Sequence, residues 1–417
     1  MTQMEKTRKE KIIQSLLVAS ALALPLILGV SIFCWVVIAF IRIANGVQRK
    51  SLMNNFKQNK ILWLLPLLYL FYLVGLLWTS NFKYAGLDLQ IKMTFLLLPL
   101  LIGTIRYSTE DIERILNGFL LGCTVACVYL LCLASVLYWE TNSLLTFFYA
   151  SFTSPLMHPT YFGMYINFAI LIVVARLFTK QERGSFVFYG FLLMFYFIIA
   201  LLIEARTAQA ATLLTVLTII GYIIYKKSYS KQSLILLAGI FILSGAANNY
   251  LNRINNRYAL VGQALEKKVE TSVKKQYDST TGRLEIWKFT GKLIRNNFLI
   301  GTGTGDVRDE LVKLYYAHDF EYGYAKKLNA HNQFLQLWAT LGLFGFLLFL
   351  AILLIPMLKF YSYSSLLFPL FLIIIVLNSL TESILEVQRG VLFFSFFYSL
   401  LGVWSLRSGK TSSEEGT

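Results

Sequence analysis

The most distinctive residue with a chemically useful side chain in this sequence is a histidine. His331 stands in "NAHNQFLQLW", directly before a long apolar run, and it is one of only three histidines in the chain. A helix N-terminus carries partial positive charge and disfavours the imidazolium. We therefore expect a neutral His331 that can accept a proton. The alternative is a histidine that only caps the helix or hydrogen-bonds a neighbour.

Two arginines could bind an anion. Arg206 lies in "IEARTAQ", a turn between two apolar runs, and Arg283 follows Thr281, a predicted N-cap, in "TTGRLEIW". A guanidinium can hold two phosphate oxygens at once, and a helix N-terminus adds partial positive charge. The alternatives are an interfacial arginine, an internal pair between Arg206 and Glu204, and a solvated loop residue for Arg283.

Four further polar residues fall near the same predicted membrane surface and could support such a site. Pro159 places a histidine at the start of a helix, "LTESILEVQRG" brings an acid and an arginine before the last apolar run, and an asparagine follows His331. The supporting candidates are therefore His158, Glu382, Arg389 and Asn332. His318 is assigned no role.

The elements that must position these residues are membrane helices. The 417 residues are 57% hydrophobic and only 14% charged, whereas soluble domains carry about 25% charged residues. About twelve apolar runs have the length of a bilayer-spanning helix. The sequence predicts an all-α polytopic membrane protein with spans near 12–29, 30–46, 61–79, 89–105, 114–138, 160–178, 186–204, 207–225, 232–248, 332–358, 363–380 and 390–406.

The distribution of Lys and Arg predicts the topology. Basic residues cluster before the first span and in alternate connections, and the short connections between these hold only Lys83, Lys92, Arg206 and Arg389. Since Lys and Arg favour the cytoplasmic side, both termini are predicted to be cytoplasmic and the candidate site periplasmic. The formal charge of +16 follows this membrane pattern, so we expect membrane lipids as partners and no nucleic acid.

The domain organisation follows from one long connection. We expect spans one to nine over 1–248, a large periplasmic loop over 249–331, three spans over 332–406 and a cytoplasmic tail over 407–417. Two amphipathic helices are predicted in the loop, the first along 261–277. The second has an apolar stripe made of Leu284, Trp287, Ile294 and Phe298.

Cofactor sites are not indicated. "LIGTGTGD" has the glycines of a nucleotide loop but lacks the following Lys-Ser/Thr, so a tight turn is the better interpretation. The histidines are scattered, and neither HExxH nor a paired-cysteine pattern occurs. The sequence predicts no metal and no cofactor.

Three motifs, in order, resemble the O-antigen ligase superfamily: "EARTAQAATLL", "TGRLEIWKFTGKLIRNNFLIGTGTGDV" and "AHNQFLQLWATLGLFGF". The resemblance implies a GT-C-like transferase of the bacterial inner membrane. Such an enzyme takes a glycan from undecaprenyl diphosphate at the periplasmic face without a metal. Arg206 and Arg283 would then hold the diphosphate and His331 would serve the acceptor hydroxyl. Glu382 matches the acidic position before the last span.

Within this resemblance the favoured activity is an O-antigen ligase, which would transfer the glycan to a lipid A–core sugar with inversion. An O-antigen or exopolysaccharide polymerase would instead join carrier-linked repeat units. A protein O-oligosaccharyltransferase and a polytopic transporter are the remaining alternatives. A transporter would favour a charged site at mid-membrane, whereas the polar candidates here gather at one face.

Overall fold

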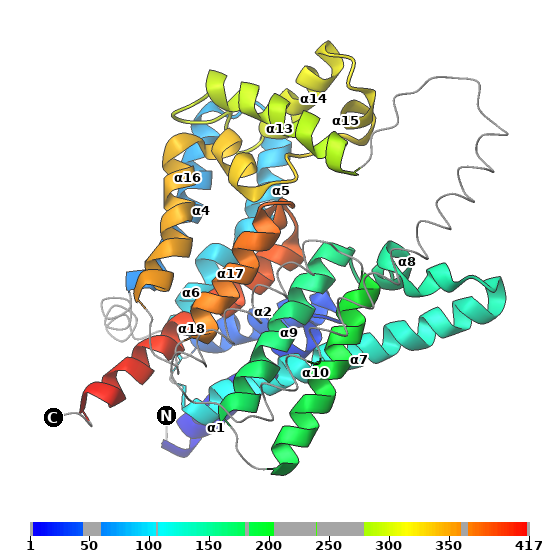
Figure 1. The fold of residues 1–417 in the computed structure, drawn as a ribbon. Helices are drawn as coiled ribbons and strands as arrows, with labels where there is room; N and C mark the ends of the chain where they lie inside the picture. The colour runs from blue at the N-terminus through cyan, green and yellow to red at the C-terminus, as the bar shows by residue number, and fades with distance from the viewer. Residues whose placement is uncertain are drawn as a thin grey trace.

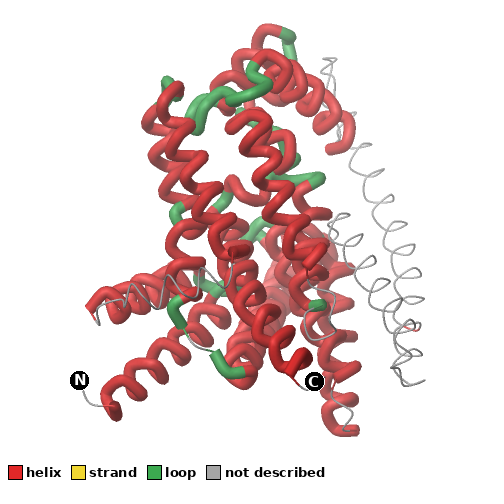
Figure 2. The backbone as a smooth tube through the Cα atoms, turned by 90° about the vertical axis from the view of Figure 1, so that its left-hand side faces the viewer, coloured by secondary structure: helices red, strands yellow, loops and turns green. Residues whose placement is uncertain are grey.

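The computed structural model describes residues 3–44, 60–105, 107–179, 183–203, 239, 279–359 and 366–414 (Figure 1). Throughout these residues the regular structure is helical (Figure 2). Among the described residues, six stretches are long and apolar enough to cross a membrane: Lys60–Trp78, Phe82–Gly103, Thr109–Thr141, Pro159–Leu177, Gly184–Ile203 and Gln333–Leu358. The protein is therefore an all-α polytopic membrane protein, as predicted.

The helices of the first half of the chain are interleaved with those of the second half. The elements of the first half are α1 (Gln3–Ala23), α2 (Leu28–Ala44), η1 (Lys60–Trp63), α4 (Leu64–Val74), η2 (Gly75–Trp78), α5 (Phe82–Lys92), α6 (Thr94–Gly103), α7 (Thr109–Thr141), η3 (Leu144–Phe147), α8 (Tyr149–Thr153), α9 (Pro159–Thr179) and α10 (Arg183–Ile203). The longest of the described helices, α7, begins with a capping box. The Ser108 side chain accepts the Asp111 backbone N–H, and the Asp111 side chain accepts the Ser108 backbone N–H.

The second half carries a peripheral layer and the last membrane helices. Its elements are α13 (Ser279–Asn296), α14 (Val307–Ala317), α15 (Glu321–Lys326), α16 (Gln333–Lys359), α17 (Leu367–Ser379), η5 (Ile384–Glu386) and α18 (Gln388–Glu414). Between the two halves, α4 packs on α16, α6 on α18 and α9 on α17. Helices α13 to α15 gather at one end of the bundle, and both chain ends lie at the opposite end (Figures 1 and 2).

Six of the predicted spans coincide with the six apolar stretches above, and the spans at 30–46 and 363–380 coincide with the shorter apolar helices α2 and α17. The predicted span 12–29 extends beyond α1, which ends at Ala23. The spans at 207–225 and 232–248, the first loop helix over 261–277, Glu204 and Arg206 lie outside the described residues. One interpretation was wrong: Lys92 is not in a connection. It ends α5 inside the apolar segment Phe82–Gly103 and is completely buried.

The core of the bundle forms around α9. Protein covers 94% of its apolar window, so this helix is shielded from lipid on nearly all sides. Aromatic side chains from four helices meet there, with the Phe168 ring centroid 4.6 Å from that of Phe397 and the Phe119 centroid 4.9 Å from it. Because lipid is as apolar as these side chains, their close packing rather than the hydrophobic effect joins the helices.

Helices α13 to α15 have a small core of their own. It includes Ile286, Phe289 and Leu293 of α13, packed with residues of α14 and α16. Two residues of the predicted apolar stripe, Leu284 and Phe298, are exposed and do not belong to this core. Thr281 was wrong as an N-cap, since α13 already includes it.

The glycine-rich turn after α13, residues 298–305, packs against α16 at a point where that helix is interrupted. Gly342 has φ 68° and ψ −167°, which interrupts the helical hydrogen bonds. The freed Ala339 and Thr340 carbonyls accept the N–H groups of Thr302 (2.8 Å) and Gly303 (3.1 Å). The N–H of Leu343 donates to the Phe298 carbonyl at 2.9 Å. These three hydrogen bonds supply partners for backbone groups at the break, as backbone near lipid requires, and the glycine run is a packing motif.

Replacing Gly342 with alanine should destabilise the protein by about 1–3 kcal/mol, because this backbone region is essentially restricted to glycine. A Cβ atom would also lie 2.2 Å from the Leu299 carbonyl oxygen. Thermal unfolding in detergent measures the effect. Gly291→Ala is the matched control, since a Cβ there meets open space within a helix. Equal unfolding temperatures for the two variants would contradict the assignment.

Candidate functional site

The backbone around His331 is held in an unusual conformation in the link between α15 and α16. His331 has φ 44°, in the left-handed region that residues other than glycine seldom adopt. Its N–H donates to Asn329 Oδ1 at 3.0 Å. The neighbouring Ala330 donates its N–H to Gln336 Oε1 and accepts Trp287 Nε1, both at 3.1 Å. Strained residues held this firmly cluster at functional sites, where a side chain must keep one direction.

The His331 side chain faces a buried carboxylate. Nδ1 lies 3.1 Å from Oε1 and 3.2 Å from Oε2 of Glu382. Glu382 comes from the link between α17 and η5 and is only 7% exposed. An ionised carboxylate can only accept, so Nδ1 carries the hydrogen and Nε2 keeps its lone pair. This arrangement can take a proton at Nε2 and stabilise the imidazolium that results, as the Asp does in Ser-His-Asp triads.

The charges around Glu382 keep it ionised. Burial alone would raise the pKa of this carboxyl, but the hydrogen bond from His331 and the electrostatic interactions with His331, His158 and Arg283 act in the opposite direction. Together they lower the pKa of Glu382 below its ordinary value of 4.5.

This shift predicts a loss of stability in acid. A carboxyl with a lower pKa in the folded chain stabilises it fully above the unfolded pKa, and the contribution disappears as pH falls through the folded value. The unfolding temperature of the wild type should therefore exceed that of Glu382→Gln at about pH 6 and approach it towards about pH 3. Glu310→Gln, at an exposed ion pair with Lys313, controls for general acid effects. A difference in unfolding temperature between the wild type and Glu382→Gln that stays constant with pH would contradict the lowered pKa of Glu382.

Two more predicted residues lie within electrostatic range of this pair. His158 precedes α9, and Arg283 belongs to the first turns of α13. The His158 side chain reaches solvent, yet the surrounding protein displaces part of its hydration. This desolvation is the main cause that lowers the pKa of His158. The electrostatic interaction with Glu382 opposes it, and those with His331 and Arg283 add to it. Four segments far apart in the sequence thus contribute to one charged cluster.

Arg389 lies in the first turn of α18. Its backbone carbonyl accepts a hydrogen bond from the Tyr165 hydroxyl at 2.9 Å. Its Nη1 is buried, and no hydrogen-bond partner for it occurs among the described residues. Buried guanidinium nitrogens nearly always have a partner, so Nη1 of Arg389 is an exception within the described part of the chain.

Asn332 fixes the start of α16. Its Oδ1 accepts the backbone N–H groups of Phe334 (3.0 Å) and Leu335 (3.1 Å), which is an N-cap. Its Nδ2 donates to the Leu380 carbonyl at 3.0 Å. The side chain therefore joins the segment that carries His331 to the end of α17, close to Glu382.

His318 lies apart from the cluster. It ends α14 at the exposed surface, where Nε2 is 3.0 Å from Lys292 Nζ and Nδ1 is 3.0 Å from the Leu314 carbonyl oxygen. Arg206 was the most distinctive arginine of the sequence, but it lies outside the described residues.

The sequence interpretation missed three residues that hold the site. Trp287 and Gln336 clamp Ala330, as described above, and Gln333 Oε1 accepts the Leu385 N–H at 2.7 Å. Gln333 and Gln336 are almost completely buried. The signal was present, since two amides inside an apolar run need buried partners, but the sequence does not show which backbone groups they bind.

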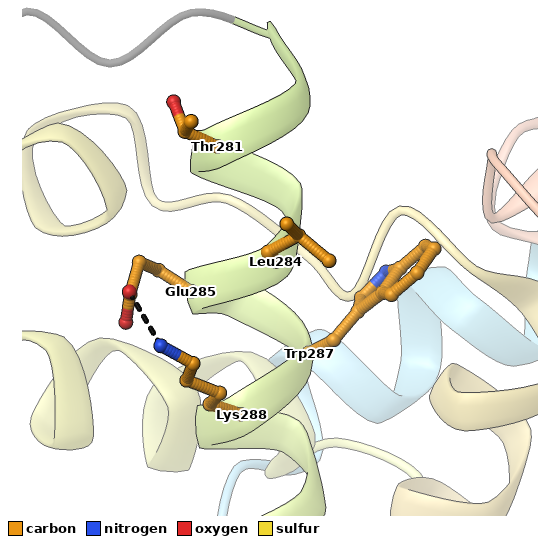
Figure 3. A pocket seen from close by; sticks show the side chains of 5 residues that line it. All are labelled: Thr281, Leu284, Glu285, Trp287 and Lys288. Atoms are coloured by element: carbon orange, nitrogen blue, oxygen red, sulfur yellow. Dashed lines mark hydrogen bonds and ion pairs between the residues drawn. The ribbon is translucent and has the colours of Figure 1, made fainter.

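An open cavity of about 470 Å³ lies along the turns of α13 that follow Thr281, and its lining does not include Arg283. Figure 3 shows its lining: Leu284 and Trp287 project to one side of the helix, and Glu285 and Lys288 form an ion pair (2.7 Å) on the other. The cavity therefore offers an apolar surface next to hydrogen-bonding groups. Within the described part of the chain, His, Cys, Asp and Glu nowhere gather into a group of three that could hold a metal ion.

Comparison with known proteins identifies the domain that contains these residues. Residues 168–350 match the family model of the O-antigen ligases. The match begins within α9, includes Arg206, Arg283 and His331, and ends within α16; His158 and Glu382 lie outside it. A search of curated proteins found no match. The resemblance predicted from the motifs is confirmed over residues 168–350, which are similar to the O-antigen ligase family.

Proposed function

We propose that this protein is an O-antigen ligase. It would transfer a glycan from undecaprenyl diphosphate to a lipid A–core sugar at the periplasmic face of the bacterial inner membrane. The observation that carries the proposal is the His331–Glu382 pair, with Arg283 and His158 in electrostatic range. The His331–Glu382 pair lies at the end of the bundle that carries α13 to α15, a position that two lipid-anchored substrates could both reach. The family match supports glycosyl transfer in general.

The proposed step is a direct displacement. The acceptor hydroxyl oxygen attacks the anomeric carbon as its proton passes to His331 Nε2. The bond from that carbon to the diphosphate oxygen breaks, and undecaprenyl diphosphate leaves with the electron pair. One displacement inverts the anomeric configuration. Glu382 holds the imidazole in the required tautomer and stabilises it once protonated.

Arginines take the role that a metal ion has in many other transferases. Arg206 and Arg283 would hold the diphosphate through paired hydrogen bonds, and Arg389 would add its unpartnered Nη1. These groups neutralise the charge that develops on the leaving group. The reaction is therefore proposed to need no metal and no cofactor.

The cavity along α13 suits the acceptor. A sugar presents both C–H faces and hydroxyl groups, and the cavity offers the Trp287 ring together with the Glu285–Lys288 pair. Trp287 also donates to Ala330 next to His331. An acceptor sugar bound there would lie near the proposed base.

Arg283→Lys and Arg206→Lys should each lower glycan transfer, although both keep the positive charge. An ammonium cannot reproduce the planar two-pronged contact of a guanidinium with phosphate, and a lost charge-assisted contact corresponds to about 10-fold or more in donor use. The kcat/KM for donor measures this. Arg308→Lys, on α14, is the matched control. Full activity in both lysine variants would show that these arginines are only interfacial.

A single incubation distinguishes the candidate functions. Purified protein receives labelled carrier-linked glycan and lipid A–core in the presence of EDTA, and the products are separated. Labelled lipopolysaccharide supports the ligase. Longer carrier-linked chains would identify a polymerase, and labelled protein an O-oligosaccharyltransferase. No new glycosidic bond would indicate a transporter. Complete loss that Mg²⁺ restores would contradict metal independence.

A further inference from the structure

A buried lysine lies in the membrane bundle apart from the charged cluster described above. Lys92 has no exposed surface, and it lies inside the apolar segment Phe82–Gly103. Charged side chains in a membrane are costly, and they are retained where they pair with other groups and serve a function.

Lys92 connects three elements of the fold. Its ammonium binds the Asp88 carboxylate one turn earlier on α5, and it lies 4.7 Å from the centre of the Tyr72 ring of α4. It also lies 3.3 Å from Glu386 Oε2 of η5. Asp88 alone would balance the lysine charge. The second carboxylate, from a segment almost 300 residues later, therefore has another consequence: it fixes η5 to α5.

The segment that Lys92 holds is the one that carries Glu382. The Ser383 N–H donates to Glu382 Oε1 at 3.2 Å, and the Glu386 N–H donates to the Ser383 carbonyl at 3.1 Å. The Leu385 N–H donates to Gln333 Oε1 at 2.7 Å. Residues 382–386 thus form one hydrogen-bonded turn, with Glu382 at one end and Glu386 at the other.

We propose that Lys92 and Glu386 are positioning residues whose ion pair fixes this turn so that the Glu382 carboxylate faces His331 Nδ1. The pair itself touches no substrate and acts only through Glu382. The test by glycan transfer rests on the proposed function. The test by chemical modification of His331 rests on the structure alone.

A double-mutant cycle separates positioning from general stability. Glu386→Gln should lower the kcat of transfer roughly 10-fold, the size expected for coupled neighbours, with little change in the KM for donor. In a Glu382→Gln background the same change should cost less than about twofold, because the carboxylate that it positions is already absent. An equal loss in both backgrounds would overturn the proposal, since a merely structural role costs the same in each.

Matched variants address folding. Lys92→Met removes the same ion pair from the other side and should show the same dependence on Glu382, whereas Lys92→Arg should retain most of the activity. Asp88→Asn leaves the Lys92–Glu386 pair in place and should cost less than Glu386→Gln. Lys83→Met changes an exposed lysine of the same helix and should behave as wild type.

A second readout needs no substrate. Diethyl pyrocarbonate modifies neutral imidazole, and mass spectrometry of peptides distinguishes the three histidines. At pH 6, Glu386→Gln should increase the modification rate of His331 about as much as Glu382→Gln does, while His318 keeps its rate. An unchanged rate at His331 would overturn the positioning role. If Glu386→Gln increased the modification rate of His331 but left transfer unchanged, the positioning role would stand and the proposed function of His331 would be contradicted.

Discussion

His331→Ala is expected to lower glycan transfer by about 10²–10⁴-fold, the usual contribution of a general base. This loss corresponds to roughly 3–5 kcal/mol of activation free energy. A sugar hydroxyl is a weak nucleophile, and its proton must leave while the new bond forms. Alanine removes the acceptor of that proton without touching the arginines, so donor binding should be retained. Single-turnover transfer and binding of carrier-linked glycan measure the two effects separately.

Two controls accompany this variant. His318→Ala removes a histidine of α14 that contacts Lys292 and the Leu314 carbonyl, and it should leave transfer unchanged. Asn332→Ala removes the α16 cap, which should cost about 1 kcal/mol of stability and less activity than His331→Ala. Transfer by His331→Ala within about threefold of the wild type would show that the base lies elsewhere. His158 would then be the next residue to test.

Glu382→Gln should reduce transfer by up to about 10⁴-fold, as the equivalent change does in serine proteases. Glutamine is nearly the same size, but its amide can donate to Nδ1 and so place the imidazole hydrogen on Nε2. The histidine would then present a hydrogen where the acceptor hydroxyl needs a lone pair. The fold should be retained, and kcat should fall with little change in the KM for either substrate.

Glu382→Asp tests the geometry of the same contact. It retains the charge but shortens the side chain, so it should lie between the wild type and Glu382→Gln in kcat. Glu310→Gln, at the exposed pair with Lys313, should have no effect. A Glu382→Gln enzyme with wild-type kcat would show that the carboxylate does not set the tautomer of His331.

The residues at the membrane surface could be chosen from the sequence because composition limits where polar groups occur in an apolar chain. The direct contact between His331 and Glu382 could not, since 51 residues separate them and only the packing of α16 against α17 brings them together. The left-handed backbone at His331 was equally hidden. The neighbouring Ala330 is held by a hydrogen bond from Trp287 Nε1 and by one that it donates to Gln336 Oε1, and no local pattern encodes either.

Apolar periodicity predicted the helices well and their faces less well. The run at 332–358 was predicted as a single span, and it is broken at Gly342 because the turn after α13 supplies partners for the freed backbone groups. The predicted apolar stripe of the loop helix included Leu284, whereas the side that packs on the neighbouring helices carries Ile286 and Phe289. Lys92 was placed in a connection, because a charged side chain inside a membrane helix needs partners. The sequence does not show that Asp88 and Glu386 supply them.

A glycine that interrupts a membrane helix is commonly regarded as a hinge, but the break in α16 has the opposite mechanical character. The backbone of residues 298–303 connects the two halves of the helix, because it hydrogen-bonds to Ala339 and Thr340 before the break and to Leu343 after it. Bending at Gly342 would expose these groups to lipid, and so would lifting the turn away. The peripheral layer and the α16 helix must therefore move as one rigid unit, so any opening that admits a lipid-linked chain has to occur at another boundary of this layer.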